Sequence, residues 1–310
     1  MSTTLPPFAR LLVPYDGSDP ARAALKIALA LAARGANLTV MTVVDETAVI
    51  SQSATTMIVY DPTPLMDALD AQGSALLSDA AEQCRTANVV PATQIVHDVP
   101  VAGIVSAIEK NASDLVIMGT HARSGVARTF MGSTTEGVLR LSRVPVLTVR
   151  TVDRIDPAPF AIAVVAVDDS EPSDAALAVA AMLARTSGTQ VVACHAVDTT
   201  QLYDNAIAYG FDPETLAGEM RQEGTAIVQG ALARAALAPD SPVAIVEGDP
   251  AGALIAAADE RHATVIVIGT HGRRGLRRFV LGSVAESIVR RSDIPVLVVP
   301  AKPSASAHAS

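Results

Sequence analysis

The sequence contains no tryptophan, and aromatic residues make up only 3% of its 310 residues. It has two cysteines, Cys84 and Cys194, and neither belongs to a CxxC pair or to a cluster of histidines and cysteines. This scarcity argues against a disulfide framework, a redox motif and a zinc site. We expect two reduced and mostly buried thiols.

Long apolar runs and excess positive charge are also missing, although half of the residues are hydrophobic. No segment reaches the roughly 20 apolar residues that span a bilayer, and residues 1–18 lack the charged start and apolar core of a secretory signal. The formal net charge of −9 disfavours binding to nucleic acid or to acidic membranes. We therefore expect a cytoplasmic protein with neither of these partners.

A long internal repeat is the main feature that the sequence does contain. Residues 119–150 read GTHARSGVARTFMGSTTEGVLRLSRVPVLTVR, and residues 269–300 read GTHGRRGLRRFVLGSVAESIVRRSDIPVLVVP. The offset is constant, 269 − 119 = 150, and about half of the aligned positions are identical. The repeat predicts two domains, at 1–150 and 160–300, joined by a linker at 151–159. Residues 301–310 carry few bulky side chains and predict a disordered tail.

Each half alternates β-branched runs with helical patterns. The first half begins with a strand and a helix over 9–35, followed by a strand at 37–46, a helix at 65–87, a strand at 93–98, a helix from Pro100, and strands at 114–118 and 144–149. The second half repeats this order at 160–188, 189–198, 214–237, 243–248, from Pro250, 264–268 and 294–299. The alternation predicts the α/β class: two tandem Rossmann-like domains, each a five-stranded parallel sheet with helices on both faces.

Several residues mark where the helices begin and end. Ser18 or Asp19 is expected to cap the first helix, and Ser170 or Ser173 the corresponding helix of the second half. Gly35 and Gly188 are expected to end those helices. Ser133 and Ser283, which follow the glycine loops, are expected to be N-caps as well.

The repeated segment has the layout of strand, glycine-spaced loop and helix start. Free backbone N–H groups at such a helix start bind phosphate. Ligands of parallel sheets bind at the carboxyl ends of the strands, so Asp16 would face the Gly119 loop if the first strand lies beside the fourth. Asp168 and Gly269 are their counterparts. A carboxylate that accepts from ribose or adenine, beside a loop that holds phosphate, suits a mononucleotide.

The second copy carries the pattern G-x2-G-x9-G-S as Gly269, Gly272, Gly282 and Ser283. This pattern, between VIVIGTHG and PVLVV, resembles the nucleotide-binding signature of the universal stress protein family. The resemblance covers nearly the whole chain, once per half. It implies adenine nucleotide alpha hydrolase-like domains, the binding of ATP with or without Mg²⁺, and a role in stress response or regulation. It also implies that the halves pair through their fifth strands as an internal pseudo-dimer; a further homodimer stays open.

The resemblance also assigns ligand-binding positions, one at a time, in both halves. In the first half they are Pro14, Tyr15, Asp16, Val43, Met118, Gly119, Gly132, Ser133, Thr134 and Thr135. In the second half they are Ala166, Val167, Asp168, Ala196, Ile268, Gly269, Gly272, Gly282, Ser283, Val284 and Ala285.

Neither half matches the family pattern fully. Ala122 stands at the second glycine of the first half, where a need for positive φ or for close phosphate approach would make alanine costly. In the second half Ala166 replaces a proline, and Val284 and Ala285 replace two hydroxyl residues. We therefore expect at least one occupied site, and different affinities in the two halves.

Structural roles compete with these assignments. The glycines suit turns and helix entries, and Asp16 and Asp168 suit helix caps or solvated turns. His121 and His271 are expected to make loop hydrogen bonds, and no catalytic or metal-binding residue is predicted.

Two other functions stay open. The first is a slow, divalent-ion-dependent ATPase, although no GxxxxGK[ST] motif is present. The second is a nucleotide-free interaction module that uses the unlike segments 47–65 and 199–213. A dinucleotide oxidoreductase is disfavoured, because the glycine motif follows the fourth strand of each half and not the first.

Overall fold

The computed structural model describes residues 7–45, 63–120, 131–150, 156–200, 212–238, 240–272 and 281–301. The chain divides into two compact units, one of which is Phe8–Pro157 while the other contains everything from Ala158 onward. We call them the N-terminal and the C-terminal domain. Most of the expected linker and tail, and the loop residues His121 and Ala122, lie outside the described residues.

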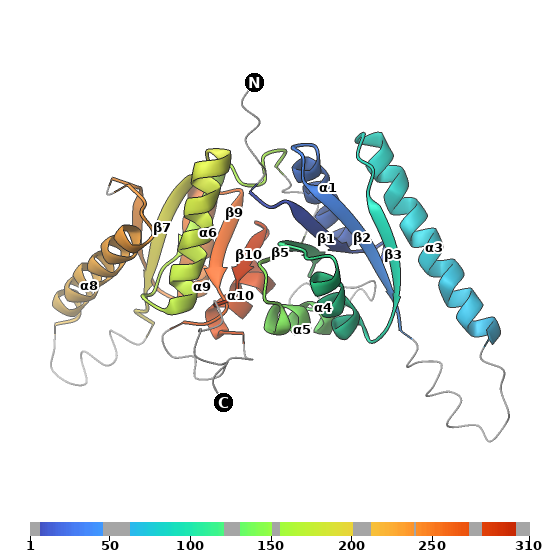
Figure 1. Cartoon of the computed structure of the whole chain (residues 1–310). Coiled ribbons are helices and arrows are strands. Elements are labelled where there is room, and N and C mark those ends of the chain that lie inside the picture. The colour runs from blue at the N-terminus through green and yellow to red at the C-terminus, as the bar shows by residue number, and fades with distance from the viewer. Residues whose placement is uncertain are drawn as a thin grey trace, which may run out of the picture. The chain divides into compact units, whose positions relative to one another are not determined.

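The N-terminal domain alternates strands and helices along the chain (Figure 1). Its elements are β1 (Arg10–Pro14), α1 (Asp19–Ala32), β2 (Asn37–Val44), α3 (Thr63–Thr86), β3 (Ala92–His97), α4 (Pro100–Lys110), β4 (Leu115–Gly119), α5 (Ser133–Leu141) and β5 (Val146–Val149). The strands lie in the order β3-β2-β1-β4-β5, and all neighbours are parallel.

The C-terminal domain repeats this arrangement. Its elements are β6 (Ile162–Ala166), α6 (Glu171–Ser187), β7 (Gln190–Val197), α8 (Pro213–Arg234), β8 (Val243–Glu247), α9 (Pro250–Glu260), β9 (Val265–Gly269), α10 (Ser283–Arg291) and β10 (Val296–Val299). The strand order is β8-β7-β6-β9-β10, again parallel throughout. The predicted α/β class with two tandem domains is confirmed, whereas the pairing of the halves stays a prediction.

Two helical glycines identify the faces that the helices cover. A Cβ on Gly73 of α3 would lie 3.3 Å from the Thr42 methyl group, whereas a Cβ on Gly103 of α4 would lie 3.4 Å from Val43. Neighbouring residues of a strand point to opposite faces of the sheet. Helices α3 and α4 therefore cover opposite faces of the sheet, as expected for a doubly wound domain.

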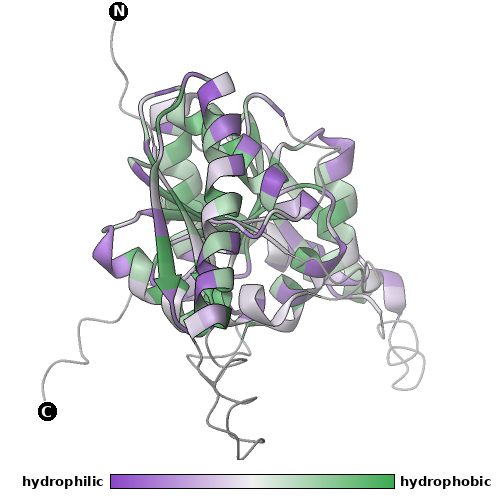
Figure 2. Cartoon of the chain, turned by 90° about the vertical axis from the view of Figure 1, so that its right-hand side faces the viewer, coloured by the Kyte–Doolittle hydropathy of each residue, from purple (hydrophilic) through white to green (hydrophobic). Residues whose placement is uncertain are grey.

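The strands in the middle of each sheet are buried on both faces. Leu12 and Val116 are fully enclosed in the N-terminal domain, as are Val164 and Val267 in the C-terminal one. Strands of this kind have sequences that are almost continuously apolar. The helices carry mixed surfaces, seen in Figure 2 as alternating purple and green along the ribbon. Among the described residues no helix is long and apolar enough to cross a membrane.

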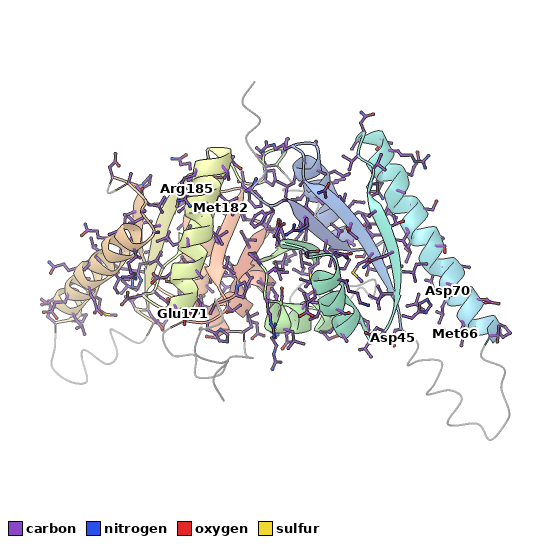
Figure 3. The ribbon with its side chains drawn as sticks, in the orientation of Figure 1. Asp45, Met66, Asp70, Glu171, Met182 and Arg185 are labelled. Carbon is purple, nitrogen blue, oxygen red and sulfur yellow. The ribbon has the colours of Figure 1, made fainter. Side chains whose placement is uncertain are left out.

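The first helix of each domain begins as expected. Ser18 Oγ accepts from the Ala21 N–H at 3.3 Å, and Ser170 Oγ accepts from the Ser173 N–H at 3.3 Å. Helix α6 ends at Gly188, which has a φ of +70°, as expected. Helix α1 instead has Ala33 as its C-cap, two residues before Gly35, so the expectation that Gly35 ends this helix is wrong. The acidic Glu171 of α6 lies at the start of that helix and the basic Arg185 near its end (Figure 3), the distribution that the helix dipole favours.

Candidate functional site

The site lies at the carboxyl end of β1, where the strand order reverses. Strand β1 has β2 on one side and β4 on the other, so the connections after β1 and β4 leave toward opposite faces and open a crevice. A cavity of about 540 Å³ occupies this place, within the size range of ligand pockets. Every first-half position named from the resemblance lines it: Pro14, Tyr15, Asp16, Val43, Met118, Gly119, Gly132, Ser133, Thr134 and Thr135.

The C-terminal domain has a larger cavity of about 890 Å³ at the same place. Its lining includes every second-half position: Ala166, Val167, Asp168, Ala196, Ile268, Gly269, Gly272, Gly282, Ser283, Val284 and Ala285. The structure thus brings each predicted set together in one cavity per domain. Whether those residues hold a ligand stays a prediction.

Helices α5 and α10 begin at these cavities without a side-chain cap. The N-caps are Gly132 and Gly282, so the expectation that Ser133 and Ser283 are the caps is wrong. Each serine occupies the first helical position instead. No described residue accepts a hydrogen bond from the N–H groups of residues 133–135 or 283–285. Each cavity is therefore bordered by three backbone donors and the positive end of a helix dipole.

Asp16 and Asp168 close turns immediately after their strands. Asp16 Oδ1 accepts from the Ser18 N–H at 3.0 Å, and Asp168 Oδ1 accepts from the Ser170 N–H at 3.2 Å. Both aspartates are thus turn residues, while Ser18 and Ser170 cap the helices. Because both aspartates also line the cavities, the turn role and the ligand role are compatible.

Gly119 and Gly269 are required by helix packing. A Cβ on Gly119 would lie 2.6 Å from the Cβ of Pro20 at the start of α1. A Cβ on Gly269 would lie 2.5 Å from the carbonyl carbon of Pro172 at the start of α6. The strand therefore approaches the first helix so closely that no side chain fits, which places that helix start beside the cavity.

Gly272 has a different reason to be glycine. Its φ is outside the left-handed region, but a Cβ would lie 2.5 Å from Oδ2 of Asp168. Of the two reasons that the sequence suggested for a glycine here, positive φ does not apply, and close approach of a phosphate stays a prediction. A side chain at residue 272 would displace the Asp168 carboxyl group.

The two cavities differ in their walls. Pro14, Met41 and Val43 line the N-terminal cavity, where Ala166, Cys194 and Ala196 line the other. These smaller side chains agree with its greater volume. In the N-terminal domain the Thr135 hydroxyl donates to the Gly119 carbonyl at 2.9 Å, so this hydroxyl already has an acceptor.

Tyr15 points its side chain away from the solvent and toward α3. It is 2% exposed, its hydroxyl donates to Asp79 Oδ2 at 2.5 Å, and Gln83 Nε2 donates to the hydroxyl at 3.0 Å. Burial, together with the hydrogen bond to Asp79, raises the pKa of Tyr15 to about 12. The backbone N–H of Tyr15 donates a hydrogen bond to the Met41 carbonyl oxygen.

This shifted pKa predicts a loss of stability at high pH. Between the usual tyrosine pKa of about 10 and the folded value of about 12, the unfolded chain releases the proton that the folded chain retains. The stability contributed by neutral Tyr15 is therefore complete below pH 10 and is lost as the pH rises toward 12, by an amount on the order of 2 kcal/mol. Alkaline titration of tyrosinate absorbance measures this pKa. Tyr15→Phe should remove the absorbance step near pH 12; an unchanged titration curve would contradict the assignment.

His195 lies between β7 and α8 in the C-terminal domain. There the shorter Val167 replaces Tyr15, and His195 replaces Thr42. The Nδ1 atom of His195 lies 2.7 Å from the Val167 carbonyl oxygen and donates to it. A Cβ on Gly224 of α8 would lie 2.7 Å from the imidazole, so this glycine makes room for the ring.

The sequence did not indicate several residues that line the cavities. Pro100 with Ile104 and Pro250 with Leu254 come from α4 and α9, and Asp198 and Asp249 add carboxylates to the C-terminal cavity. The sequence does contain a signal for α4 and α9. Each of these helices follows an outer parallel strand and therefore begins at the same edge of the sheet as the cavity. The Arg291 guanidinium beside Asp249 lowers the pKa of this carboxyl.

The cysteines and the loop histidine have structural surroundings. Cys84 and Cys194 are free and fully buried, and burial raises the pKa of Cys194 to about 11. His271 Nδ1 lies 2.9 Å from the Thr270 hydroxyl, as expected for a loop hydrogen bond. Within the described part of the chain no group of three or more acidic, histidine or cysteine residues could hold a metal ion.

The sequence model of the universal stress protein family matches residues 7–150 and again residues 160–300. Universal stress protein Rv2623 of Mycobacterium tuberculosis (strain ATCC 25618 / H37Rv) is 27% identical over 295 residues, which cover 93% of this chain and 95% of that protein. Universal stress protein YxiE of Bacillus subtilis (strain 168) is 32% identical over 148 residues, 46% of this chain and 99% of that protein.

A solved structure agrees with these sequence matches. The crystal structure of a universal stress protein from Archaeoglobus fulgidus DSM 4304 superimposes with a TM-score of 0.67 at 23% identity, covering 97% of this chain and 98% of that one. At this identity the likeness shows a common fold. Since the family match extends over both domains, the chain belongs to the universal stress protein family, with one family domain in each half.

Proposed function

We propose that this chain binds ATP in both cavities and acts as a cytoplasmic nucleotide-binding protein of stress response or regulation. The observation that carries the proposal is the convergence on one cavity, in each domain, of a strand-end aspartate and three helix N–H groups that donate to no described residue. Helix N–H groups suit phosphate, and a carboxylate suits the hydroxyls of a ribose.

The ligand positions named from the resemblance are part of this proposal. In the N-terminal cavity Met118 and Val43 lie beside Pro14, on the side where we place adenine. Ser133 and Thr134 lie at the start of α5, where we place the phosphates. The C-terminal cavity has Ile268 and Ala196 on the adenine side and Ser283 at the start of α10.

We further propose that the nucleotide is a ligand that stabilises the folded protein and is not turned over rapidly. A ligand that binds only the folded state raises stability with the logarithm of its concentration. Mg²⁺ could accompany ATP on the phosphates themselves, which needs no dedicated protein cage. Chromatography of ATP after prolonged incubation with the protein measures turnover.

Calorimetric titration of nucleotide-free protein with ATP, and in parallel with adenosine, tests the proposal. We expect two binding events with ATP, of unequal affinity because the cavities differ in volume and lining. Adenosine should bind each cavity at least tenfold more weakly, since it lacks the phosphates that the helix N-termini would hold. No heat and no thermal shift with ATP would contradict the proposal, as would equal affinity for adenosine.

A further inference from the structure

The turn that carries each strand-end aspartate contains a residue with left-handed backbone conformation. In the N-terminal domain this residue is Gly17, with a φ of +77°; in the C-terminal domain it is Asp169, with a φ of +62°. Glycine adopts this conformation freely, whereas a residue with a Cβ adopts it at a cost. The turn after Asp168 therefore needs contacts that hold it.

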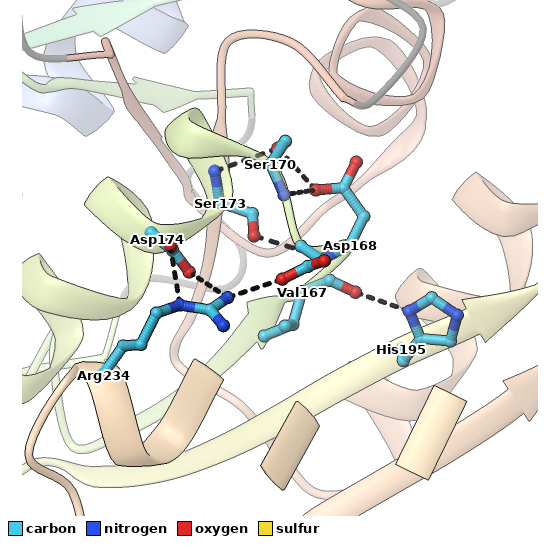
Figure 4. A network of polar contacts seen from close by, with 8 residues as sticks. Val167, Asp168, Ser170, Ser173, Asp174, His195 and Arg234 are labelled. Atoms are coloured by element: carbon cyan, nitrogen blue, oxygen red, sulfur yellow. Dashed lines mark hydrogen bonds and ion pairs between the residues drawn. The ribbon is translucent and has the colours of Figure 1, made fainter. Parts of the chain in front are cut away.

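Arg234, the last residue of α8, supplies such contacts (Figure 4). Its Nη2 atom lies 2.8 Å from Oδ1 of Asp169. Its Nε and Nη2 atoms each lie 2.9 Å from a carboxylate oxygen of Asp174 on α6. This bidentate geometry is the one in which a guanidinium fixes a carboxylate most firmly. A single side chain thus connects the turn, α6 and α8.

The conformation of the turn determines where Asp168 lies. Asp168 Oδ1 accepts from the Ser170 hydroxyl at 2.5 Å and from its N–H at 3.2 Å, while the Asp168 N–H donates to Ser173 Oγ at 3.3 Å. Asp169 lies between the two partners Asp168 and Ser170. A rotation of its φ out of the left-handed region would separate them and move the Asp168 carboxyl group within the cavity.

The N-terminal domain connects the same three elements with an arginine on a different helix. Arg22 of α1 donates from Nε to the Gly17 carbonyl at 3.2 Å, and its Nη1 lies 3.2 Å from Asp79 of α3. Arg22 corresponds to Asp174 when Ser18 is matched with Ser170, so the charges across the two helices are exchanged. Each domain therefore has an arginine that connects the turn to both helices, although the residues differ. We relate this connection to the cavity, because the turn carries the aspartate that lines it.

We propose that Arg234 is a positioning residue of the C-terminal cavity. It holds Asp169 in the left-handed conformation and thereby holds Asp168 where a ligand hydroxyl would meet it. The identity of that ligand rests on the proposed function, whereas the effect of Arg234 on the turn is measurable without any ligand.

Site-resolved hydrogen–deuterium exchange of the full chain tests this role. Arg234→Gln places glutamine where the N-terminal domain has Gln83, and it removes both ion pairs. We expect faster exchange of residues 167–173 without ligand. We also expect ATP to protect residues 281–289 with a dissociation constant roughly fivefold higher, the effect of losing two half-exposed ion pairs. Protection of residues 131–139, at the other cavity, should be unchanged.

Two further variants separate positioning from general stabilisation. Arg221→Gln removes an ion pair of the same helix, with Glu247 at 2.9 Å and similar exposure, and should leave both cavities unchanged. Asp169→Gly in the Arg234→Gln background introduces the glycine that the N-terminal domain has at Gly17. It should restore most of the affinity for ATP, because glycine adopts the required φ without the contacts of Arg234.

Wild-type exchange and wild-type affinity in Arg234→Gln would overturn the inference. Weak binding that Asp169→Gly does not restore would also overturn it, because the loss would then come from the docking of α8 as a whole. If ATP protects neither cavity in the wild-type protein, the proposed function fails instead. Exchange of residues 167–173 without ligand then still decides whether Arg234 holds the turn.

Discussion

The Ser283→Asp variant is expected to bind ATP at the C-terminal cavity about a hundredfold more weakly, and yet to be more stable than wild-type protein when no nucleotide is present. Ser283 is exposed and occupies the first position of α10. An aspartate there interacts favourably with the positive end of the helix, by about 0.3–1 kcal/mol. The same carboxylate competes with a phosphate for the free N–H groups and repels it.

The repulsion dominates in the presence of nucleotide. Two like charges about 5 Å apart at an effective dielectric constant of about 20 repel by roughly 3 kcal/mol, which is about a hundredfold in affinity. Urea unfolding without nucleotide and calorimetric titration with ATP measure the two effects. Their opposite signs separate loss of a binding site from loss of the fold.

The neutral variant Ser283→Asn is the matched control and should change ATP affinity by less than about threefold. Ser133→Asp should do to the N-terminal cavity what Ser283→Asp does to the other. If Ser283→Asp binds ATP like the wild type, the phosphates do not lie at the start of α10. The proposed placement of the ligand would then be wrong.

The Gly269→Ala variant is expected to destabilise the C-terminal domain by about 3 kcal/mol. The added methyl group would lie 2.5 Å from the carbonyl carbon and 2.6 Å from the oxygen of Pro172. Both are backbone atoms, so no rotation of a side chain relieves the overlap, and β9 and α6 must separate. Urea unfolding followed by circular dichroism should show an earlier transition for that domain.

Gly218→Ala is the control for the removal of a glycine. Gly218 lies in α8, and the nearest atom to an added Cβ is the flexible Arg221 guanidinium at 3.9 Å. Alanine there should stabilise the domain by up to about 1 kcal/mol. Unchanged stability of Gly269→Ala would show that the strand and the helix are not packed as closely as described.

The alternation of strands and helices was predictable because it depends on local signals. Apolar runs, helix caps such as Ser18 and Ser170, and prolines at the starts of α4 and α9 are all visible in the sequence. The repeat placed both cavities, since Gly132 and Gly282 follow the fourth strand of each half. Ser133 and Ser283 misled the cap assignment because serine suits both the N-cap and the first helical position.

The residues that connect distant segments were not predictable. Tyr15 with Asp79 and Arg234 with Asp169 are pairs separated by more than sixty residues. The exchange of charges between the Arg22–Asp79 pair and the Asp174–Arg234 pair hides the equivalence of those two links. The reason for glycine at residues 119 and 269 was likewise invisible, because it depends on how closely α1 and α6 pack on the sheet. A spacing pattern identifies a site, whereas the packing of its walls depends on the whole domain.

The most direct test of ATP binding is to denature the freshly purified full-length chain and quantify the released nucleotide by anion-exchange chromatography with mass detection. ATP should be recovered at between one and two molecules per chain. Two molecules per chain would mean that both cavities bind ATP. One molecule per chain would mean that only one cavity binds it, and the variants Ser133→Asp and Ser283→Asp would show which one. Protein free of adenine nucleotide, together with no thermal shift on adding ATP, would contradict the account and favour a nucleotide-free interaction module.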